Sequence, residues 1–447
     1  MAGWRGLVAC IAGGAGATSA CGAQPASPPG FPGGEAAADW AHSPLLAAGA
    51  TGSDVGLTLY SDGWGLVSDA RPVTLVAGAQ VARFEGVATT TDPRGALFEA
   101  PGTVAGVRFR NDAANRERLL DRFDGQRVEV FSAEASQTLA GILRMTPAGP
   151  LFQVGDRLYT EPPGTVILPG HGALAVRPAL DFLVRAGHAW SGTATASYLA
   201  GQLGWSCEYT LTTDVRQGAG HLSQWAAMSN GSGLTYRDAS VTLVAGATRR
   251  GGGFPPPMPM RTMAPGMAGA EAADVAPERF AVRYLFRLPQ RMTLERDDQA
   301  RVLLSGERAV PITRTFRLEE GVAPFRHPDP DLPAKARVRL TLENTEAGGL
   351  GIPLPAGRVT VYTPDARGRR QLAGESAIPD TPVDQRILLD MGEAFDVTAR
   401  RTQTSFTEYP DAKEIGYRSQ LRNQTDAAVT VEVYENIPGD WRLLAAS

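Results

Sequence analysis

Short clusters of polar or sulfur-bearing side chains have the composition of a metal site. His327, Asp329 and Asp331 bring one imidazole and two carboxylates together, and these ligand types bind divalent cations. The prolines between them keep the segment extended, so the side chains diverge and we expect a solvent-facing linker. A second acidic cluster, Arg296-Asp297-Asp298, is expected to be a turn between two strands.

A third cluster consists of four thioethers. Met258, Met260, Met263 and Met267 lie close together, and thioethers are soft ligands that suit Cu(I). No histidine or cysteine accompanies them, and methionine is a common filler of low-complexity sequence. Copper binding is therefore kept only as an alternative, and the sequence predicts no metal and no cofactor.

The sequence has three cysteines, of which Cys10 and Cys21 lie near the N-terminus. The third, Cys207, is a lone thiol that could be a nucleophile or a small buried hydrophobe. It alternates with Trp205 and Tyr209, which predicts that it lies on the apolar face of a strand. We expect Cys207 to be buried, and we expect no internal disulfide after N-terminal processing.

The familiar catalytic motifs are missing from the sequence. It contains no HExxH, GxSxG, Walker or CxxC motif, and its five histidines are scattered. We therefore assign no catalytic residue. Catalytic carboxylates need no local motif, so an envelope hydrolase with a pair such as Glu375 and Asp396 stays an alternative.

Length, charge and composition exclude several classes of protein. The 447 residues suggest two to three domains at roughly 150 residues each. The net charge is −4, from 43 Lys and Arg against 47 Asp and Glu. The sequence therefore lacks the overall excess of positive charge that is typical of proteins that bind nucleic acid or an anionic membrane. The 51 glycines and 33 prolines favour turn-rich β structure over helix bundles.

The N-terminus resembles an export signal, which we place at residues 1–23. Arg5 precedes a short apolar stretch that is too short to span a bilayer. The run Ser19-Ala20-Cys21-Gly22 resembles a lipobox with Thr18 where leucine is usual, and cleavage before Cys21 would leave a lipid-anchored cysteine. Cleavage after Ala23 would instead release a soluble exported protein, and the two alternatives stay open.

Side chains alternate with period two over much of the sequence. From His188 to Tyr198 and from Trp205 to Leu211, apolar residues alternate with Ser, Thr and Glu, which predicts a hairpin with one dry face. The pattern returns from Phe280 to Leu288. The exception, Asn111 to Phe123, predicts a short helix with Asn111 or Asp112 as its N-cap. Strands separated by Gly/Pro turns predict an all-β protein of antiparallel β-sandwich domains.

Composition also divides the chain into segments. Residues 24–52 are rich in Pro, Gly, Ala and Ser and are expected to form a flexible tether. Residues 251–277 have few β-branched side chains to pack a core, so we expect a disordered insertion. We place an N-terminal β domain at 53–180 and a second β region at 181–447.

Exposed aromatic side chains offer one possible ligand surface. Trp190, Trp205 and Trp225 could stack on the sugars of an envelope polysaccharide if they lined a common groove. Most of the aromatic side chains here lie opposite a Ser/Thr face, so packing in the core is the preferred interpretation.

Five stretches carry a recognisable signature: ASYLAGQLGWSCEYTL (196–211), MSNGSGLTYRDASVTLVAG (228–246), GLGIPLPAGRVTVYTPDARGRRQLAGE (349–375), MGEAFDVTARRTQTSF (391–406) and EVYENIPGDW (432–441). In this order they resemble the bacterial domain-of-unknown-function 4139 family, whose longer members include mucoidy inhibitor A-like proteins. The resemblance implies an exported, β-rich protein without an established activity. No heptad-bearing coiled coil separates the two β regions, unlike in the longer relatives.

The signature residues themselves predict chain geometry more readily than chemistry. We expect Gly392 to bend a strand, Phe395 to anchor the core and Asp396 to cap the backbone. The leading hypothesis is a non-enzymatic, exported cell-envelope module, anchored through Cys21, that serves a structural or interaction role. Its partner would be an envelope protein or polysaccharide, with membrane contact only through the lipid. A carbohydrate-binding or adhesion module is the alternative beside the hydrolase.

Overall fold

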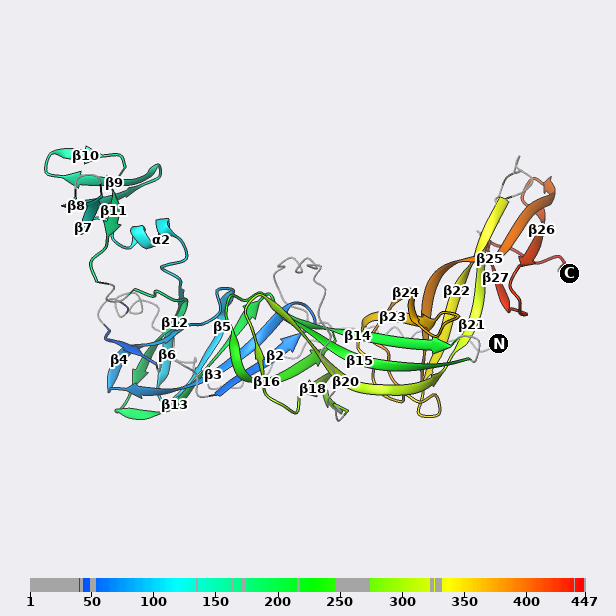
Figure 1. The fold of residues 1–447 in the computed structure, drawn as a ribbon, viewed down its shortest axis with the longest axis horizontal. Helices are drawn as coiled ribbons and strands as arrows, with labels where there is room; N and C mark the ends of the chain where they lie inside the picture. Colours follow the sequence, from blue (N-terminus) through cyan, green and yellow to red (C-terminus); the bar gives the residue numbers. More distant parts are fainter. Residues whose placement is uncertain are drawn as a thin grey trace, which may run out of the picture.

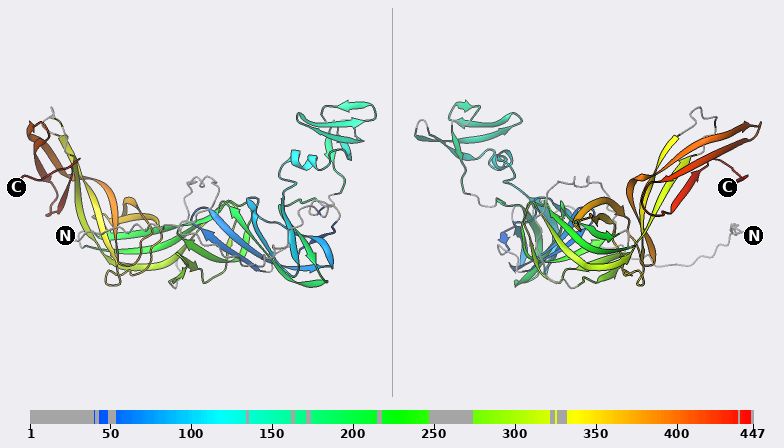
Figure 2. Two further views of the ribbon diagram at one scale, coloured as in Figure 1. Left: turned by 180° about the vertical axis from the view of Figure 1, so that it is seen from behind. Right: turned by 45° about the vertical axis from the view of Figure 1, so that its right-hand side comes forward.

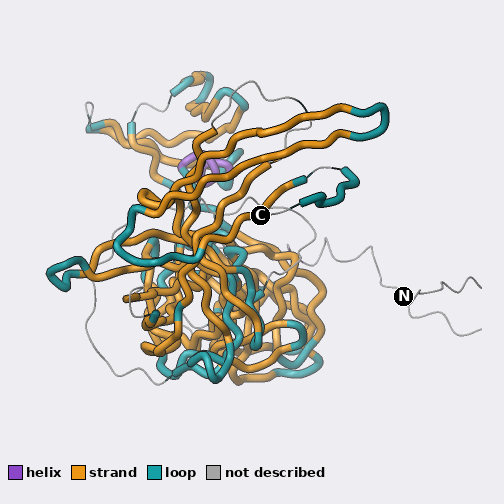
Figure 3. The backbone as a smooth tube through the Cα atoms, turned by 90° about the vertical axis from the view of Figure 1, so that its right-hand side faces the viewer, coloured by secondary structure: helices purple, strands orange, loops and turns teal. Residues whose placement is uncertain are grey.

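The structure, a computed structural model, describes residues 40, 43–48, 54–133, 136–161, 164–170, 174–214, 218–246, 274–321, 325, 332–437 and 439–445. The all-β prediction is confirmed, because strands dominate these residues and α2 (Arg116–Asp121) is a short helix (Figure 3). A central body of strands carries a small sheet at one end and a C-terminal arm at the other (Figures 1 and 2). The predicted signal, Cys21 and most of the tether lie outside the described residues. Face-to-face sandwich packing stays a prediction.

The body is built on a 13-stranded sheet. Its main path is β17-β18-β16-β2-β14-β15-β20, and the other six strands pair beside that path. The bounds are β2 (Asp54–Tyr60), β3 (Trp64–Leu75), β5 (Thr91–Glu99), β13 (Trp190–Gly201), β14 (Leu203–Asp214), β15 (Ala219–Asn230), β16 (Tyr236–Ala245), β17 (Pro277–Phe280), β18 (Arg283–Arg287), β19 (Met292–Leu294), β20 (Asp298–Pro311), β23 (Gly357–Pro364) and β24 (Arg370–Ile378). The largest buried apolar core of the described residues follows this sheet.

Several ladders of the body are parallel, whereas we predicted antiparallel sandwich domains. β2 lies between β16 and β14 and is parallel to both, and β14 also runs parallel to β23. Parallel neighbours need long connections, and here the paired strands are separated by more than a hundred residues of chain. Most remaining ladders are antiparallel, as expected.

The two strands predicted at residues 188–198 and 205–212 do not pair with each other, so the predicted hairpin is wrong. Each strand nevertheless buries the face that was predicted to be buried. β13 pairs with β3 along its whole length, from Trp190 opposite Leu75 to Gly201 opposite Trp64, and β14 pairs with β15. The apolar side chains of both β13 and β14 nevertheless point into the core. Period-two alternation reports which face is buried, and it carries no information about the partner strand.

A four-stranded sheet adjoins the body with the order β1-β4-β12-β6. Its strands are β1 (Leu45–Ala47), β4 (Gly78–Glu85), β6 (Thr103–Arg110) and β12 (Ala179–Ala186). β12 crosses the domain boundary that we placed at residue 180. In addition, β3 from before that boundary pairs with β13 from after it. The sheets are therefore shared across the predicted boundary.

Between β6 and β12 the chain forms a small projecting sheet with its own core. Its order is β10-β9-β8-β7-β11, and its strands are β7 (Arg127–Ser132), β8 (Gln137–Thr146), β9 (Gly149–Val154), β10 (Arg157–Tyr159) and β11 (Thr165–Ile167). Leu120 of α2 and Phe152 of β9 belong to its buried core. The helix is shorter than predicted, and its N-cap is Asn115, whose side chain accepts a hydrogen bond from Arg118 N at 2.8 Å.

The C-terminal arm is a five-stranded sheet with the order β26-β25-β22-β21-β27. Its strands are β21 (Thr313–Gly321), β22 (Leu332–Asn344), β25 (Gln385–Glu408), β26 (Lys413–Asn423) and β27 (Val431–Asn436). The arm projects from the body in each view of Figure 2. Its own core is small and contains Phe316, Ala336, Ala394 and Val397. Much of the arm therefore stays in contact with solvent.

The strand predicted from Phe280 to Leu288 is a tight hairpin of β17 and β18. Ala281 has φ +51°, and Val282 in the turn is 90% exposed. The insertion predicted at 251–277 falls outside the described residues up to 273. Its last residues are described and return to the body, where Val275 N donates to Leu304 O at 2.8 Å.

Candidate functional site

The structure does not assemble the three predicted tryptophans into one platform. Trp205 is buried, and its Nε1 donates to Val244 O at 3.0 Å while its ring packs edge-on against Phe286. Trp225 lies on the other face of the β14–β15 ribbon, where it is the cross-strand partner of Glu208. Trp190 packs partly buried against the core at the start of β13. A sugar ring cannot reach Trp205 without unfolding this face.

The accessible face of Trp225 is already covered by a protein side chain. The Arg301 guanidinium lies 4.3 Å from the Trp225 ring centroid, and Arg301 Nε pairs with Glu208 Oε2 at 3.0 Å. This cation–π contact occupies a position that a stacked ligand would need.

Cys207 is buried, as predicted. Burial raises the pKa of its thiol to about 11, although hydrogen bonds with Tyr209 and Gln224 act in the opposite direction. The thiol is therefore protonated at neutral pH. Because the thiolate is the nucleophile, Cys207 is a packing residue here.

The two carboxylates suggested as an acid–base pair are exposed to solvent and are not enclosed in a buried site. Glu375 on β24 is exposed, with Oε2 at 3.8 Å from Arg358 Nη1, and Asp396 on β25 is also exposed. A general acid at neutral pH needs a raised pKa, which burial normally provides. The expected backbone cap by Asp396 is not seen, since only its carbonyl accepts a hydrogen bond, from Gln424 N at 2.8 Å.

Of the remaining predicted clusters, the Arg296–Asp298 segment is the one that the structure describes. The Arg296–Asp298 segment is a turn, as predicted, with Asp297 at φ +60° and its N–H donated to Asn230 O at 2.7 Å. His327, Asp329, Asp331 and the four methionines lie outside the described residues. Within the described ranges, no group of three or more metal-ligating side chains occurs.

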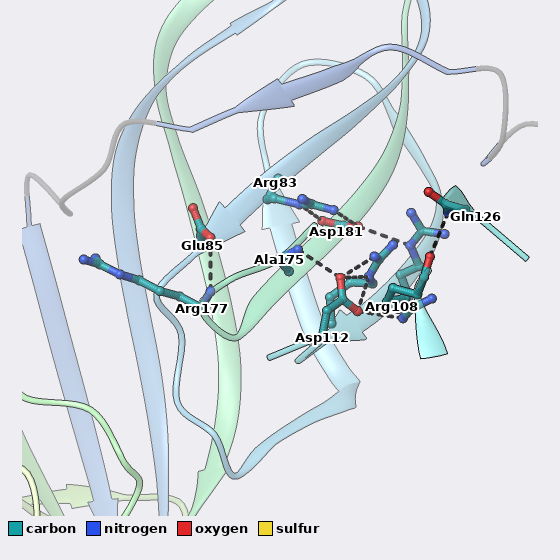
Figure 4. Close-up of polar contacts among 10 residues, drawn as sticks. Arg83, Glu85, Arg108, Asp112, Gln126, Ala175, Arg177 and Asp181 are labelled. Atoms are coloured by element: carbon teal, nitrogen blue, oxygen red, sulfur yellow. Dashed lines mark hydrogen bonds and ion pairs between the residues drawn. The ribbon is translucent and has the colours of Figure 1, made fainter. Parts of the chain in front are cut away.

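An ion-pair ladder crosses the four-stranded sheet and was missed by the sequence analysis. Asp181 of β12 has a fully buried carboxylate that accepts hydrogen bonds from Arg83 Nε at 2.7 Å and from Arg108 Nε at 3.2 Å (Figure 4). All three are cross-strand partners, because Asp181 is in register with Arg83 on β4 and with Arg108 on β6. The Arg108 guanidinium also lies 4.1 Å from the Trp40 ring centroid.

A second buried carboxylate lies where the projecting sheet leaves the body. Asp112 accepts a hydrogen bond from Ala175 N at 2.9 Å, pairs with Arg122 at 2.6 Å and contacts Arg110 (Figure 4). Burial alone would raise the pKa of Asp112, but these partners together hold the pKa below its ordinary value. Asp112 thus joins the two chain segments that carry the projecting sheet, which explains why it is not a helix cap.

Two buried asparagines organise the turns of the signature stretches. Asn230 Nδ2 donates to Leu234 O at 2.8 Å, Glu295 O at 2.9 Å and Leu294 O at 3.1 Å. In this way one side chain satisfies backbone carbonyls from two segments that are far apart in sequence.

Asn344 plays the same part at the end of β22. Its Nδ2 donates to Ile352 O at 2.8 Å and Pro382 O at 2.9 Å, with Thr381 O at 3.4 Å. The following turn includes Gly349 at φ +81°, where a Cβ atom would lie 2.0 Å from Ala309 O. Only glycine fits such an approach to the backbone.

The glycine-rich stretch also brings β23 close to β14. Gly357 is in register with Cys207, and a Cβ atom there would lie 2.2 Å from Cys207 O. Tyr209 OH donates to Pro355 O at 2.7 Å, which fixes the segment just before β23. The signature residues of this region therefore shape strand contacts.

One signature residue is placed differently from the prediction. Phe395, expected as a core anchor, is 88% exposed. The ladder between β22 and β25 shifts register between Arg337 and Arg339, near Gly392 at φ +90°. Ala394 then faces the core in place of Phe395. The bend at Gly392 is confirmed, and the irregular ladder beside it buries Ala394 and exposes Phe395 before the original alternation resumes at Val397.

These contacts define an all-β protein whose signature residues build corners and close strand contacts. The chain belongs to the family described as Domain of unknown function (DUF4139), whose model matches residues 194–440. No curated protein matches the chain. None of the helices that the structure describes is long and apolar enough to cross a membrane. The finer resemblance to mucoidy inhibitor A-like proteins stays a prediction.

Proposed function

We propose that this protein is an exported, non-catalytic interaction module that binds its partner through the C-terminal arm. The observation that carries the proposal is that β26 ends the sheet and is exposed along most of its length. A strand at the edge of a sheet offers unpaired N–H and C=O groups to an extended segment of a partner protein. Apolar side chains that include Leu421, Val433 and Tyr434 are exposed on β26 and β27.

The alternatives find less support in the described residues. Stacking on sugars is disfavoured because Trp205 is buried and Arg301 covers Trp225. Hydrolysis is disfavoured because Glu375 and Asp396 are both exposed. A protein partner that adds a strand to the arm needs none of these side chains.

A photo-crosslinking experiment in cells tests the arm. With benzoylphenylalanine in place of Leu421, we expect a discrete adduct with an envelope protein after irradiation, because this residue lies on β26, the proposed docking edge. The control positions are Val282 and Leu97, which are also exposed apolar residues but lie in the body. Adducts of equal yield from the body, or none from the arm, would contradict the proposal.

Export and anchoring form the second part of the proposal. The apolar N-terminus and the lipobox-like run before Cys21 support it. In cells given radiolabelled palmitate, we expect label in the wild type and none in Cys21→Ala, because this cysteine would carry the acyl chains. Equal incorporation in the two proteins, or none in either, would remove the anchor while leaving the arm proposal untouched.

A further inference from the structure

A hollow of about 360 Å³ lies where the arm meets the body, and we call it the junction hollow. Its lining comes from β21, β22 and β25 of the arm and from β14, β23 and β24 of the body. All of its lining residues fall within the segment that matches the family model. Small-molecule sites occur preferentially in such hollows between structural units, with volumes of roughly 300–1,000 Å³.

The walls of the junction hollow are mostly apolar and firmly packed. Phe316, Leu340, Val361 and Val397 are each no more than 5% exposed, so they form a fixed surface. Met391 adds an adaptable side chain, and the exposed Phe395 also belongs to the lining. These walls would receive a compact apolar group.

Opposite charges accompany these apolar walls. The Arg314 guanidinium lies 5.4 Å from the Phe316 ring centroid, and within the described ranges it has no carboxylate partner. Asp396 also lines the hollow, and its carboxylate has no cationic partner among the described residues. The other acidic lining residue, Glu393, is already paired, with Oε2 at 3.4 Å from Lys335 Nζ. One cation and one anion therefore remain available to a ligand.

We propose that the junction hollow binds a small zwitterion with an apolar body, of which a free apolar α-amino acid is the simplest example. Its carboxylate would pair with Arg314, its ammonium with Asp396, and its side chain would contact the apolar walls. A purely anionic ligand would meet the repulsion of Asp396, and a purely cationic one that of Arg314. Charge complementarity thus selects a ligand that carries both groups.

Calorimetric titration of the full chain tests this assignment with L-phenylalanine as the probe. We expect saturable binding of one molecule per chain. We expect 3-phenylpropionate, which lacks the ammonium, and 2-phenylethylamine, which lacks the carboxylate, to bind about tenfold more weakly or worse. Absence of saturable heat with L-phenylalanine up to about 10 mM would overturn the proposal. Equal affinity for 3-phenylpropionate would also overturn it, because the ammonium would then make no contribution.

Charge-removing variants then identify the two contacts. Arg314→Gln should weaken the binding of L-phenylalanine by about tenfold but strengthen that of 2-phenylethylamine, because the repulsion of its ammonium is removed. Asp396→Asn should likewise weaken L-phenylalanine and strengthen 3-phenylpropionate. Arg422→Gln and Asp411→Asn are the matched controls, since both residues are exposed and lie outside the lining. Unchanged affinity in Arg314→Gln, with an unchanged unfolding midpoint, would contradict the proposal. Crosslinking from the arm does not depend on these residues, so the two proposals fail separately.

Discussion

Replacing Asp181 by alanine is expected to lower the free energy of unfolding by about 3 to 5 kcal/mol. The carboxylate is fully buried, and Arg83, its nearest partner, is only 4% exposed. Removing the carboxylate takes away the charged group that directly pairs with the buried Arg83 guanidinium. Arg108 contributes less to this cost, because it is partly exposed and keeps its contact with Trp40. Urea unfolding followed by tryptophan fluorescence measures the change.

Two controls make the Asp181 result specific. Glu278→Ala breaks an exposed ion pair with Arg287 and should cost less than about 1 kcal/mol. The double variant Arg83→Met with Asp181→Leu removes both charges and should be less destabilised than Asp181→Ala, because no buried charge is left alone. A small effect of Asp181→Ala, comparable to that of Glu278→Ala, would show that the ladder is not a structural clamp.

Replacing Asn344 by alanine is the second substitution for which we expect a large effect, roughly 2 to 5 kcal/mol. Asn344 is completely buried, and its amide satisfies the carbonyls of Ile352 and Pro382. Without the amide, both carbonyls lose this donor, and a polar group left unpaired away from water costs about 1–3 kcal/mol. The turn that includes Gly349 would lose the group that joins it to β22. Equilibrium unfolding in urea again provides the measurement.

Asn423 is a matched control because it makes the same kind of contact at the surface. Its Nδ2 donates to Ala427 O at 2.8 Å, but the residue is exposed. Water can replace the amide there, so Asn423→Ala should cost less than about 1 kcal/mol. Asn344→Asp should not rescue stability, because a carboxylate cannot donate to the carbonyls. Similar stability of the Asn344 and Asn423 variants would be evidence against the role of Asn344 in this turn.

The sequence predicted the buried faces of strands better than their partners. Trp205, Cys207 and Tyr209 all face the core as expected, because alternation is a local property. The neighbours of β14 come from residues near 60, 220 and 360, and no local pattern links those positions. The predicted hairpin failed for this reason.

Some residues have a role in the structure that their local sequence did not predict. Asp112 is a residue type that often caps helices, but here its buried carboxylate pairs with arginines and accepts a hydrogen bond from Ala175 N. Asn115 caps the helix instead. Phe395 shares the parity of the buried Leu389 and Val397, yet the irregular ladder after Gly392 leaves it exposed. The junction hollow was not predictable either, because Arg314 and Asp396 come together only through the arm and carry no motif.

The position of β2 has a consequence for the order of events during folding. This strand contains some of the first described residues of the body, but it lies between β14 and β16, which are made well over a hundred residues later. β14 in turn pairs with β23, which begins at Gly357. During synthesis β2 can pair early with β3, which follows it directly, but its ladders with β14 and β16 must wait until those strands have been made. The high contact order of these late ladders implies slow folding.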